Sequence, residues 1–400
     1  MPLIIPSFQY SVVPFSNVMA DGLGRGLEKL GKRITRWLLS TLTARHRRKW
    51  RGIGDDDDIR RIIVVRQHNQ FGDVLCTIPL LKALHSKFRL EELAVVVSPQ
   101  NIDAIRGCKW LTKIVNYDKL SFYKKPSLFF NFFRELRKGY DILLVPSNVS
   151  MSLTNDVMAF FIKAKTKIGP RSLEGRSNQT SSVYDLALDL SWNDVIIHQA
   201  FRNMKVAAPL QIFPIKDDGE LEYEVDEHFL SETNNLVRRS HMASSEAYNA
   251  SYFKIAIHAG AGKPKNRWNA WNFAKLSELL HDNLTVELFF TEGSFDHDTM
   301  EHITNLIKAP FVRVRNKGIQ FVAAFLKKMD LVITNDTGIM HLSAAVGTPT
   351  LSLFGPTDPL QWAPMGKKHR FILGRSNDVN TIDVDKVFRI TRKILFANRT

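Results

Sequence analysis

One stretch near the C-terminal end of the chain constrains its fold more than any other. Residues 331–334 (LVIT) are apolar or β-branched, residues 335–338 (NDTG) form a polar turn, and a helix of small residues is expected to end near Gly347. A strand that stops at such a turn and continues as a helix places free backbone N–H groups and the positive end of the helix dipole at the turn. The stretch therefore predicts an anion site, and we expect a phosphate-bearing ligand there.

A second strand and loop follow at once. Residues 351–354 (LSLF) are typical of a buried strand, and residues 355–359 (GPTDP) form the loop after it. Open α/β sheets bind ligands in the loops at the carboxyl ends of their strands. Two such loops on consecutive strands indicate one ligand site built from both.

Short apolar strands alternate with helical patterns along most of the chain. Strands are predicted at 59–65, 93–97, 140–145, 253–258, 285–291, 331–334 and 351–354. This alternation is typical of parallel, doubly wound α/β sheets, and 400 residues exceed what one hydrophobic core usually holds. The polar stretch 169–180 is predicted to be a basic loop.

The alternation predicts a division into four parts. Residues 1–58 form a basic amphipathic extension, and residues 59–240 and 241–380 form two Rossmann-like domains. A C-terminal helix at 381–400 carries an apolar stripe that would allow it to pack back across the seam between the domains.

Positive charge is concentrated at the N-terminal end. The net charge is +15, and residues 1–50 contain nine Lys or Arg against two acids. Apolar residues recur at helical spacing between Gly22 and Trp50, with basic residues around the other face; the apolar positions are Leu23, Leu27, Leu30, Ile34, Trp37 and Leu38. Such a helix lies in an anionic membrane interface or packs its stripe on the protein's own core, and the sequence leaves both interpretations open.

Three further features bear on the cellular setting. Cys76 and Cys108 show no motif spacing and are expected to be free thiols in a reducing compartment. No segment reaches the roughly 20 apolar residues that a spanning helix needs. A helix rich in phenylalanine is predicted at 129–138, and it offers a second apolar surface for membrane contact. We expect a cytoplasmic protein, peripheral to a membrane surface.

Asp73 follows Gly72 where the first predicted strand gives way to a helix. A carboxylate at this position stabilises the helix N-terminus, which is the structural interpretation. The functional interpretation is a general base, because an ionised carboxylate accepts a proton from a hydroxyl within hydrogen-bond reach.

A glycine-containing basic loop at 258–268 (HAGAGKPKNRW) follows the first strand of the second half. Gly260 and Gly262, on either side of Ala261, allow the backbone to approach a ligand closely, and the cations that follow, Lys263 and Arg267 among them, would neutralise a leaving diphosphate. The alternative is a solvated basic loop. The sequence contains neither the phosphate-binding loop Gly-x-x-x-x-Gly-Lys-Ser/Thr nor the nucleophile turn Gly-x-Ser-x-Gly. It also lacks Cys and His residues at zinc-ligand spacing, so no metal site is predicted.

Three blocks of residues resemble glycosyltransferase family 9, the family of the ADP-heptose:lipopolysaccharide heptosyltransferases. They are Phe71–Leu75 with Pro79 and Leu80, His258–Ala261 with Arg267 and Trp268, and Asn335–Gly338 with His341 and the loop 354–359. The resemblance extends from about Ile59 to Gly366, and the last block is the most specific in order and spacing. It implies a GT-B fold, in which the two Rossmann-like domains face each other across a cleft, and metal-independent transfer with inversion at the sugar's anomeric carbon.

The resemblance also implies roles for residues by position. Asp73 would be the base that activates the acceptor hydroxyl, and Arg267 would contact the donor phosphates. The diphosphate and sugar would be held by the turn and the helix after it, at Asp336, Thr337, Gly338 and His341.

An acidic loop at 292–296 would hold the ribose of the donor, and both Glu292 and Asp296 are candidates. The chain departs from the family in its N-terminal extension, in the loop 66–70 before Gly-Asp, and in a middle block without the threonines of some heptosyltransferases. These departures bear on the sugar and the acceptor more than on the reaction type.

These observations predict an inverting, metal-independent glycosyltransferase. It would move a sugar, heptose by resemblance, from ADP-heptose or a similar nucleotide-sugar to a lipopolysaccharide core or another anionic glycolipid or glycan. No cofactor besides this co-substrate and no nucleic acid are expected, and the N-terminal helix would contact the membrane surface. The alternative is a non-catalytic nucleotide or nucleic-acid phosphate-binding protein, which predicts a steep salt dependence of binding. A Rossmann dehydrogenase is disfavoured because Gly-x-Gly-x-x-Gly is missing after the first strand.

Overall fold

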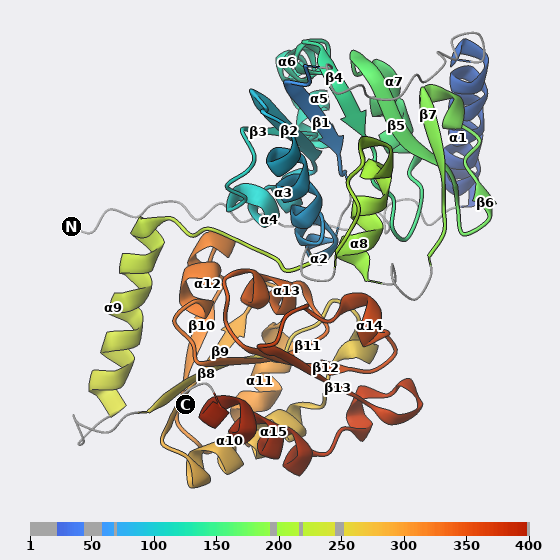
Figure 1. Cartoon of the computed structure of the whole chain (residues 1–400). Helices are drawn as coiled ribbons and strands as arrows, with labels where there is room; N and C mark the ends of the chain where they lie inside the picture. The colour runs from blue at the N-terminus through green and yellow to red at the C-terminus, as the bar shows by residue number, and fades with distance from the viewer. Residues whose placement is uncertain are drawn as a thin grey trace.

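The chain folds into two α/β domains, one above the other in Figure 1. The computed structural model describes residues 22–43, 58–67, 70–192, 198–215, 219–244 and 252–397, without the side chains of residues 22–27, 123 and 238–244. Of the predicted N-terminal extension, residues 1–21 and 44–57 lie outside the described residues.

The first domain is built on a seven-stranded sheet in the order β3-β2-β1-β4-β5-β6, with β7 also paired to β5. The strand pairs are parallel except β5 with β6. The strands are β1 (Arg61–Val65), β2 (Glu92–Val97), β3 (Lys113–Asn116), β4 (Tyr140–Leu144), β5 (Ala164–Leu173), β6 (Arg176–Ser177) and β7 (Leu186–Leu190).

Helices cover both faces of this sheet, which explains the unbroken apolar run of β1. Ile62 and Val64 belong to the core on one face, and Ile63 and Val65 belong to the core on the other. The first face is covered by α2 (Phe71–Leu75), α3 (Ile78–Lys87), α4 (Ile102–Arg106) and α8 (Gln199–Met204). The second face is covered by α1 (Gly22–Thr43), α6 (Pro126–Leu136) and α7 (Leu153–Phe161), with α5 (Lys119–Lys124) packed against α6.

The second domain contains a six-stranded parallel sheet in the order β10-β9-β8-β11-β12-β13. Its strands are β8 (Phe253–His258), β9 (Val286–Glu292), β10 (Phe311–Arg315), β11 (Leu331–Asn335), β12 (Thr350–Phe354) and β13 (His369–Leu373). The helices of this domain are α10 (Ala270–Asn283), α11 (His297–Leu306), α12 (Ile319–Leu326), α13 (Gly338–Ala345), α14 (Pro359–Trp362) and α15 (Val384–Ala397). Both sheets therefore have the doubly wound order that was predicted, with a reversal beside the first strand of each.

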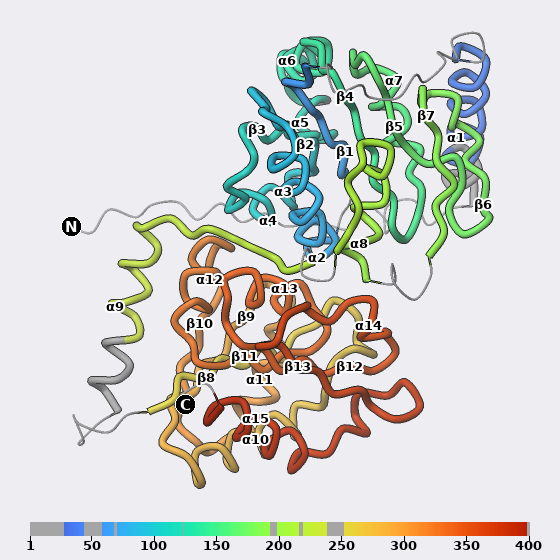
Figure 2. The backbone as a smooth tube through the Cα atoms, viewed as in Figure 1, coloured from blue at the N-terminus to red at the C-terminus, as the bar shows by residue number. Residues whose placement is uncertain are grey.

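The two domains share one hydrophobic cluster at their seam. Leu75 and Leu80 from the first domain and Leu342 and Ala345 from the second belong to it. Helices α2 and α13 are in contact across the seam, as the tube in Figure 2 shows, and the backbone N–H of Tyr223 donates to the carbonyl of Ala345 (2.8 Å). The carboxyl ends of β1 and β11 therefore meet at the seam.

The structure differs from the sequence-based expectations at several elements. The stretch 169–180 is not a loop, because β5 runs to Leu173 and turns at Glu174 and Gly175 (φ 50° and 75°) into β6. The single helix predicted after β1 is two helices, α2 and α3, with Pro79 in the first turn of the second.

Two parts of the predicted domain division lie elsewhere. Helix α9 (Glu227–Ser244) packs against α12, beside the lower domain in Figure 1, so its contacts favour a boundary before residue 227. Helix α15 places Val387 and Leu395 in the core of the second domain and contacts α10 and β11. Its stripe is used within this domain, where we had expected packing across the seam.

Candidate active site

The turn between β11 and α13 has the predicted strand–turn–helix geometry. Thr337 is the N-cap, and its side-chain oxygen accepts a hydrogen bond from the backbone N–H of Ile339 (3.1 Å). The side chains of α13 are buried from Met340 to Ala345, so packing fixes the position of the helix with its N-terminus at the seam. The positive end of the helix dipole therefore lies beside Asp336, Thr337 and Gly338.

Asn335 joins this turn to the basic loop after β8. It is fully buried, and its side-chain amide donates to the carbonyls of Ala259 (2.8 Å) and Gly260 (3.3 Å). Its side-chain oxygen accepts from the backbone N–H of Trp268 (3.0 Å). Sequence reasoning did not assign Asn335 this role; the signal was a polar residue at the end of a buried strand.

Asp336 connects three loops of the second domain. It accepts a hydrogen bond from the side chain of Asn266 (3.0 Å), whose amide also lies 3.5 Å from the hydroxyl of Thr357. Burial raises the pKa of the Asp336 carboxyl, and a hydrogen bond from Thr357 and the charge of Lys263 act in the opposite direction. The carboxyl therefore fastens the loops after β8, β11 and β12 to one another.

The two cations of the basic loop that are candidates for donor binding occupy different positions. Arg267 is half-buried, and its Nε donates to the carbonyl of Ala261 (2.8 Å). Lys263 is exposed next to Gly262. Arg267 thus has a fixed direction, whereas Lys263 is exposed to solvent with its charge near the carboxyl of Asp336.

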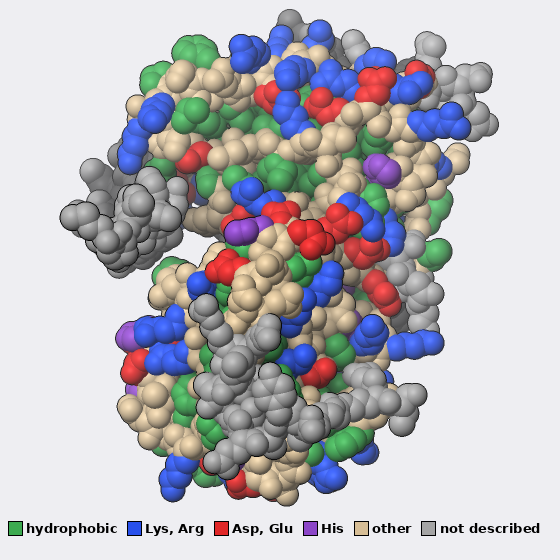
Figure 3. Space-filling model, turned by 90° about the vertical axis from the view of Figure 1, so that its left-hand side faces the viewer, with side chains coloured by type: hydrophobic (Ala, Val, Ile, Leu, Met, Phe, Trp, Pro, Cys, Tyr) green, Lys and Arg blue, Asp and Glu red, His purple; other side chains and the backbone are tan. Residues whose placement is uncertain are grey.

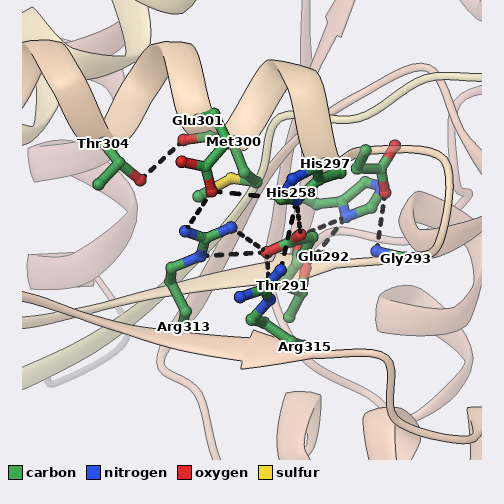
Figure 4. Close-up of polar contacts among 11 residues, drawn as sticks. His258, Thr291, Glu292, Gly293, His297, Met300, Glu301, Thr304, Arg313 and Arg315 are labelled. Atoms are coloured by element: carbon green, nitrogen blue, oxygen red, sulfur yellow. Dashed lines mark hydrogen bonds and ion pairs between the residues drawn. The ribbon is translucent and has the colours of Figure 1, made fainter.

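The two candidate acids, one at the end of β9 and one in the loop after it, have distinct surroundings. The Glu292 carboxylate is buried and receives hydrogen bonds from Arg313 Nη2 (2.7 Å) and Nε (3.1 Å), with Arg315 Nε at 3.4 Å. Figure 4 shows both arginines converging on Glu292 from β10.

Asp296 instead lies against the basic loop. It accepts from the backbone N–H of Gly293 (2.9 Å), and its Oδ2 is 4.0 Å from Nε2 of the buried His258. A Cβ placed on Gly260 would lie 2.1 Å from the Asp296 carboxylate, so Gly260 is required for this close approach. The sequence left Glu292 and Asp296 as alternatives, and their contacts distinguish them.

Asp73 is buried in the first turn of α2, in a polar cluster of the first domain. Its carboxylate lies 3.4 Å from the Asn148 amide nitrogen and 3.9 Å from Nη2 of Arg66. Arg66 is itself buried and donates to Asn148 (3.0 Å) and to the hydroxyl of Thr77 (3.2 Å). Sequence reasoning had noted loop 66–70 only as a departure, yet Arg66 and Asn148 orient Asp73.

Two glycine–aromatic contacts bring the Asp73 helix against the donor turn. A Cβ on Gly72 would lie 2.7 Å from the His341 ring, and a Cβ on Gly338 would lie 2.8 Å from the Phe71 ring. Burial, with the charge of His198, lowers the pKa of His341 to about 3, so this ring is neutral at neutral pH. The predicted base and the predicted anion site, far apart in sequence, thus meet at one place.

This arrangement matches a known family. The sequence profile of glycosyltransferase family 9 (heptosyltransferase) matches residues 129–389, which is well over half of the chain. The chain belongs to glycosyltransferase family 9. This glycosyltransferase has the GT-B fold that was predicted, and membership of an enzyme family disfavours the interpretation as a non-catalytic phosphate binder.

Individual relatives are distant. Lipooligosaccharide heptosyltransferase 2 of Haemophilus influenzae is 28% identical over 113 residues, which cover 27% of this chain and 33% of that protein. The lipopolysaccharide core heptosyltransferase OpsX of the same organism is 22% identical over 297 residues, covering 73% of this chain and 78% of the relative. The chain therefore matches about a third of the length of the first relative and most of the second.

Solved structures share the fold. A family 9 glycosyltransferase of Veillonella parvula superposes with a TM-score of 0.73 at 18% identity, covering 85% of this chain and 98% of that one. The ADP-heptose lipopolysaccharide heptosyltransferase II of Escherichia coli superposes with a TM-score of 0.66 at 18% identity, covering 85% and 100%. The superpositions thus cover nearly all of these two solved chains and 85% of this one.

A metal site is not apparent in the part of the chain that the structure describes. No group of three or more His, Cys, Asp or Glu side chains there is placed to hold an ion. Cys76 and Cys108 are free and buried, and burial raises the pKa of the Cys108 thiol to about 11. Neither thiol has the exposure or the lowered pKa of a reactive cysteine.

Proposed function

We propose that this glycosyltransferase transfers heptose from ADP-heptose, or from a similar nucleotide-sugar, to an acceptor hydroxyl of a lipopolysaccharide core or a related anionic glycolipid or glycan. The transfer inverts the anomeric carbon and uses no metal. One observation carries the proposal: α2, which bears Asp73, touches α13, which begins at the anion-binding turn. The residue proposed as the base and the turn proposed to hold the leaving diphosphate therefore belong to adjacent elements.

Asp73 is proposed to be the general base. The acceptor oxygen attacks the anomeric carbon while the bond from that carbon to the diphosphate oxygen breaks, and the hydroxyl proton passes to the Asp73 carboxylate. Attack from the side opposite the leaving group inverts the anomeric centre. Asn148 and Arg66 hold the carboxylate in place, which keeps the base oriented before the substrate arrives.

The leaving diphosphate is proposed to lie at the N-terminus of α13. The backbone N–H groups after Thr337, the helix dipole and the cations Lys263 and Arg267 would stabilise its charge without a metal ion. We assign ADP-heptose as the first donor to test because E. coli heptosyltransferase WaaC, which superposes with TM-scores of 0.65 and 0.64, has been solved with ADP and with ADP-2-deoxy-2-fluoro heptose.

We assign the ribose hydroxyls of the donor to Asp296. Glu292 is already neutralised by Arg313 and Arg315, so a hydroxyl would compete with two charged partners. Asp296 lies beside Gly260 in the donor loop and makes one backbone hydrogen bond there. Its second oxygen therefore retains acceptor capacity for a ligand.

Calorimetry in the presence of EDTA tests both the donor and the contact of Asp296 with its ribose. ADP-heptose should bind, and GDP-, UDP- and dTDP-sugars should bind at least about tenfold more weakly. Asp296→Ala should weaken ADP-heptose binding about tenfold, the effect of losing one charge-assisted hydrogen bond. Binding of none of the four nucleotide-sugars, or binding only after a divalent cation is added, would contradict the proposal.

Glu292→Gln is the matched comparison for Asp296→Ala. It should lower the free energy of unfolding by about 1–3 kcal/mol, since it leaves two arginines with a neutral partner. The affinity of the folded protein for the donor should change little. If Glu292→Gln rather than Asp296→Ala abolished binding, the ribose assignment would be reversed.

The acceptor and the location complete the proposal. An anionic glycolipid acceptor would hold the enzyme at the cytoplasmic face of the inner membrane as a peripheral protein. The relatives named above as lipopolysaccharide and lipooligosaccharide heptosyltransferases support this class of acceptor. Transfer of labelled heptose to purified heptose-deficient core glycolipid is the direct assay.

A further inference from the structure

Helix α1 is attached to the first domain by one narrow side. Leu39 and Thr43 are buried, the hydroxyl of Thr43 lies 2.6 Å from that of Ser182, and the helix contacts α7 and the short helical turn Ser181–Val183. Leu39 and Thr43 are four residues apart and therefore lie on one side of α1. That side is the one facing the protein.

The apolar stripe of α1 lies on the opposite side. Leu30, Ile34, Trp37, Leu38 and Leu42 keep 45–65% of their surface exposed. At about 100° of rotation per residue, the centre of this stripe is roughly opposite Leu39 and Thr43. The described side chains of the stripe therefore do not pack on the protein's own core, and the interpretation of α1 as a helix with a buried stripe is wrong for them. The side chains of Leu23 and Leu27 lie outside the described residues.

Exposed cations lie on the polar side of the helix, away from the stripe. Lys29, Lys32, Arg33 and Arg36 are all exposed, and Glu28 is the acid next to them, at hydrogen-bond distance from Lys32 (2.5 Å). A helix that combines exposed large apolar side chains with lysine and arginine suits the interface of an anionic bilayer. Nucleic acid would use the cations but leave Trp37 and its apolar neighbours in water.

A second apolar patch lies on the same side of the first sheet. On α6, Leu128, Phe129 and Phe130 are 40–67% exposed, and Phe161 at the end of α7 is 39% exposed. The rings of Phe129, Phe133 and Phe161 form a continuous series, with Phe133 and Phe161 centroids 5.5 Å apart.

Helices α1, α6 and α7 together form this layer. Helix α7 contacts α1 and joins the two patches, and all three helices cover the same face of the sheet. Lys124, Lys125, Arg134 and Arg137 are exposed around the aromatic patch. Figure 3, which faces the side of the molecule away from α1, shows Lys and Arg side chains dispersed among apolar ones on that side of the upper domain.

We propose that α1 and the exposed ends of α6 and α7 form one docking face for an anionic lipid bilayer. The apolar side chains enter the headgroup boundary, and the long cationic side chains on the polar side of α1 and around the aromatic patch are attracted to the anionic headgroups. No helix in the described ranges is long and apolar enough to cross a bilayer, so the attachment in these ranges is on the surface. The inference deepens the proposed function by placing the acceptor domain on the membrane that carries a glycolipid acceptor.

Vesicle co-sedimentation tests the docking face without donor or acceptor. The full chain should bind vesicles of phosphatidylglycerol and phosphatidylethanolamine and should not bind vesicles of phosphatidylcholine. The double variant Ile34→Ser/Trp37→Ser should lose about tenfold or more in affinity for the anionic vesicles, and Lys29→Gln/Arg33→Gln should lose a similar factor at low salt.

Trp271→Ser is the matched control. Trp271 is 53% exposed on α10 of the other domain, beside Lys275, whose ammonium lies 5.1 Å from the ring centroid. It has a similar exposure and a neighbouring cation but lies outside the docking face, and its substitution should leave vesicle binding unchanged. If Ile34→Ser/Trp37→Ser and Trp271→Ser lost the same affinity for anionic vesicles, or if neither lost any, the docking face would be overturned.

Two further measurements separate this proposal from its competitors. Light scattering without lipid should find the same mass for the wild type and the Trp37 variant; a wild-type dimer that the variant abolishes would show that a second copy covers the stripe instead. Heptose transfer to a delipidated core saccharide should be equal in both proteins. Loss of transfer in both would contradict the proposed function while leaving vesicle binding to decide the docking face.

Discussion

At the scale of single residues, the position of Asp73 depends on neighbours that are distant in sequence. Arg66 directly follows the first strand and Asn148 follows the fourth, and both side chains converge on the first turn of α2. Burial lowers the pKa of Arg66, and the charge of Asp73 raises it again, so each charge stabilises the other. A buried carboxylate needs such partners, because an isolated charge in the interior is strongly destabilising.

Asp73→Asn should remove the base and keep most of the shape. We expect kcat for heptose transfer to fall about 10²–10⁴-fold, the usual contribution of a general base. The free energy of unfolding should fall by about 1–3 kcal/mol, because Arg66 loses its buried anionic partner. Donor affinity, measured by calorimetry, should remain within about threefold of the wild type.

Asp103→Asn is the control for this change. Asp103 is also an acid in the first turn of a helix, but it is exposed and pairs with Arg106 three residues on (2.9 Å). Transfer activity should be unaffected there. Full activity of a folded Asp73→Asn protein would eliminate Asp73 as the base.

At the scale of elements, α2 and α13 approach each other because each carries a glycine opposite an aromatic ring of the other. Phe71 lies over Gly338, and His341 lies over Gly72. Neither glycine has a positive φ, so the requirement comes from space at the seam and not from backbone conformation. A side chain at either position would force the two helices apart by tenths of an ångström or more.

Gly338→Ala should therefore lower stability by about 1–3 kcal/mol and reduce transfer activity, through the clash with Phe71. The double variant Phe71→Leu/Gly338→Ala should recover part of the stability, since the smaller side chain leaves room for the new methyl group. A double-mutant cycle from chemical denaturation measures this coupling, and a coupling energy near zero would contradict direct contact.

Gly347→Ala provides a contrasting glycine variant just after the same helix. Gly347 follows α13 with a positive φ of 84°, and no atom lies within 4 Å of its added Cβ. This variant should be destabilised by backbone strain alone, by about 1 kcal/mol, and Phe71→Leu should not rescue it.

At the scale of the whole molecule, buried neutral histidines hold the two domains together. His198 in the first domain has its Nε2 3.0 Å from the carbonyl of Ala363 in the second, and its Nδ1 accepts from the N–H of Ala200 (3.3 Å). A carbonyl only accepts, so the proton is on Nε2 and Nδ1 is free to accept. A second proton would break the bond to Ala200.

This arrangement makes stability dependent on pH. Burial lowers the pKa of His198 to about 4, below its ordinary value of about 6.5. As pH falls through 6.5 toward 4, the unfolded chain takes up a proton that the folded chain does not, so stability present at pH 7.5 is progressively lost. Burial lowers the pKa of His369 to about 4 as well, which acts in the same direction.

The free energy of unfolding should therefore fall between pH 7.5 and pH 5.5, with His198 contributing about 1.4 kcal/mol of the loss. His198→Gln should show a pH-dependent loss smaller by about that amount in urea denaturation at the two pH values. An unchanged pH dependence in this variant would show that His198 is protonated in the folded protein.

Much of the fold was predictable because its strands are buried on both faces. The runs at β1, β2, β4, β8, β9, β11 and β12 are nearly all apolar, and their predicted positions agree with the structure to within one or two residues. Strand β5 was missed because its polar and charged residues, such as Lys165, Lys167 and Arg171, interrupt the apolar pattern. Its pairing with β4 and β7 overrides that local pattern.

The sequence by itself determined the doubly wound architecture, the polar turn before α13 and the amphipathic character of α1, because these follow from local periodicity and turn chemistry. Tertiary structure decided which side of α1 contacts the protein and which of the two acids, Glu292 or Asp296, is paired with arginines. It also decided that α2 contacts α13. Each of these outcomes depends on packing between residues far apart in the chain, as in the contact of Cys76 with His341 across 265 positions. Spacing along a sequence carries no information about such partners until the two domains are folded against each other.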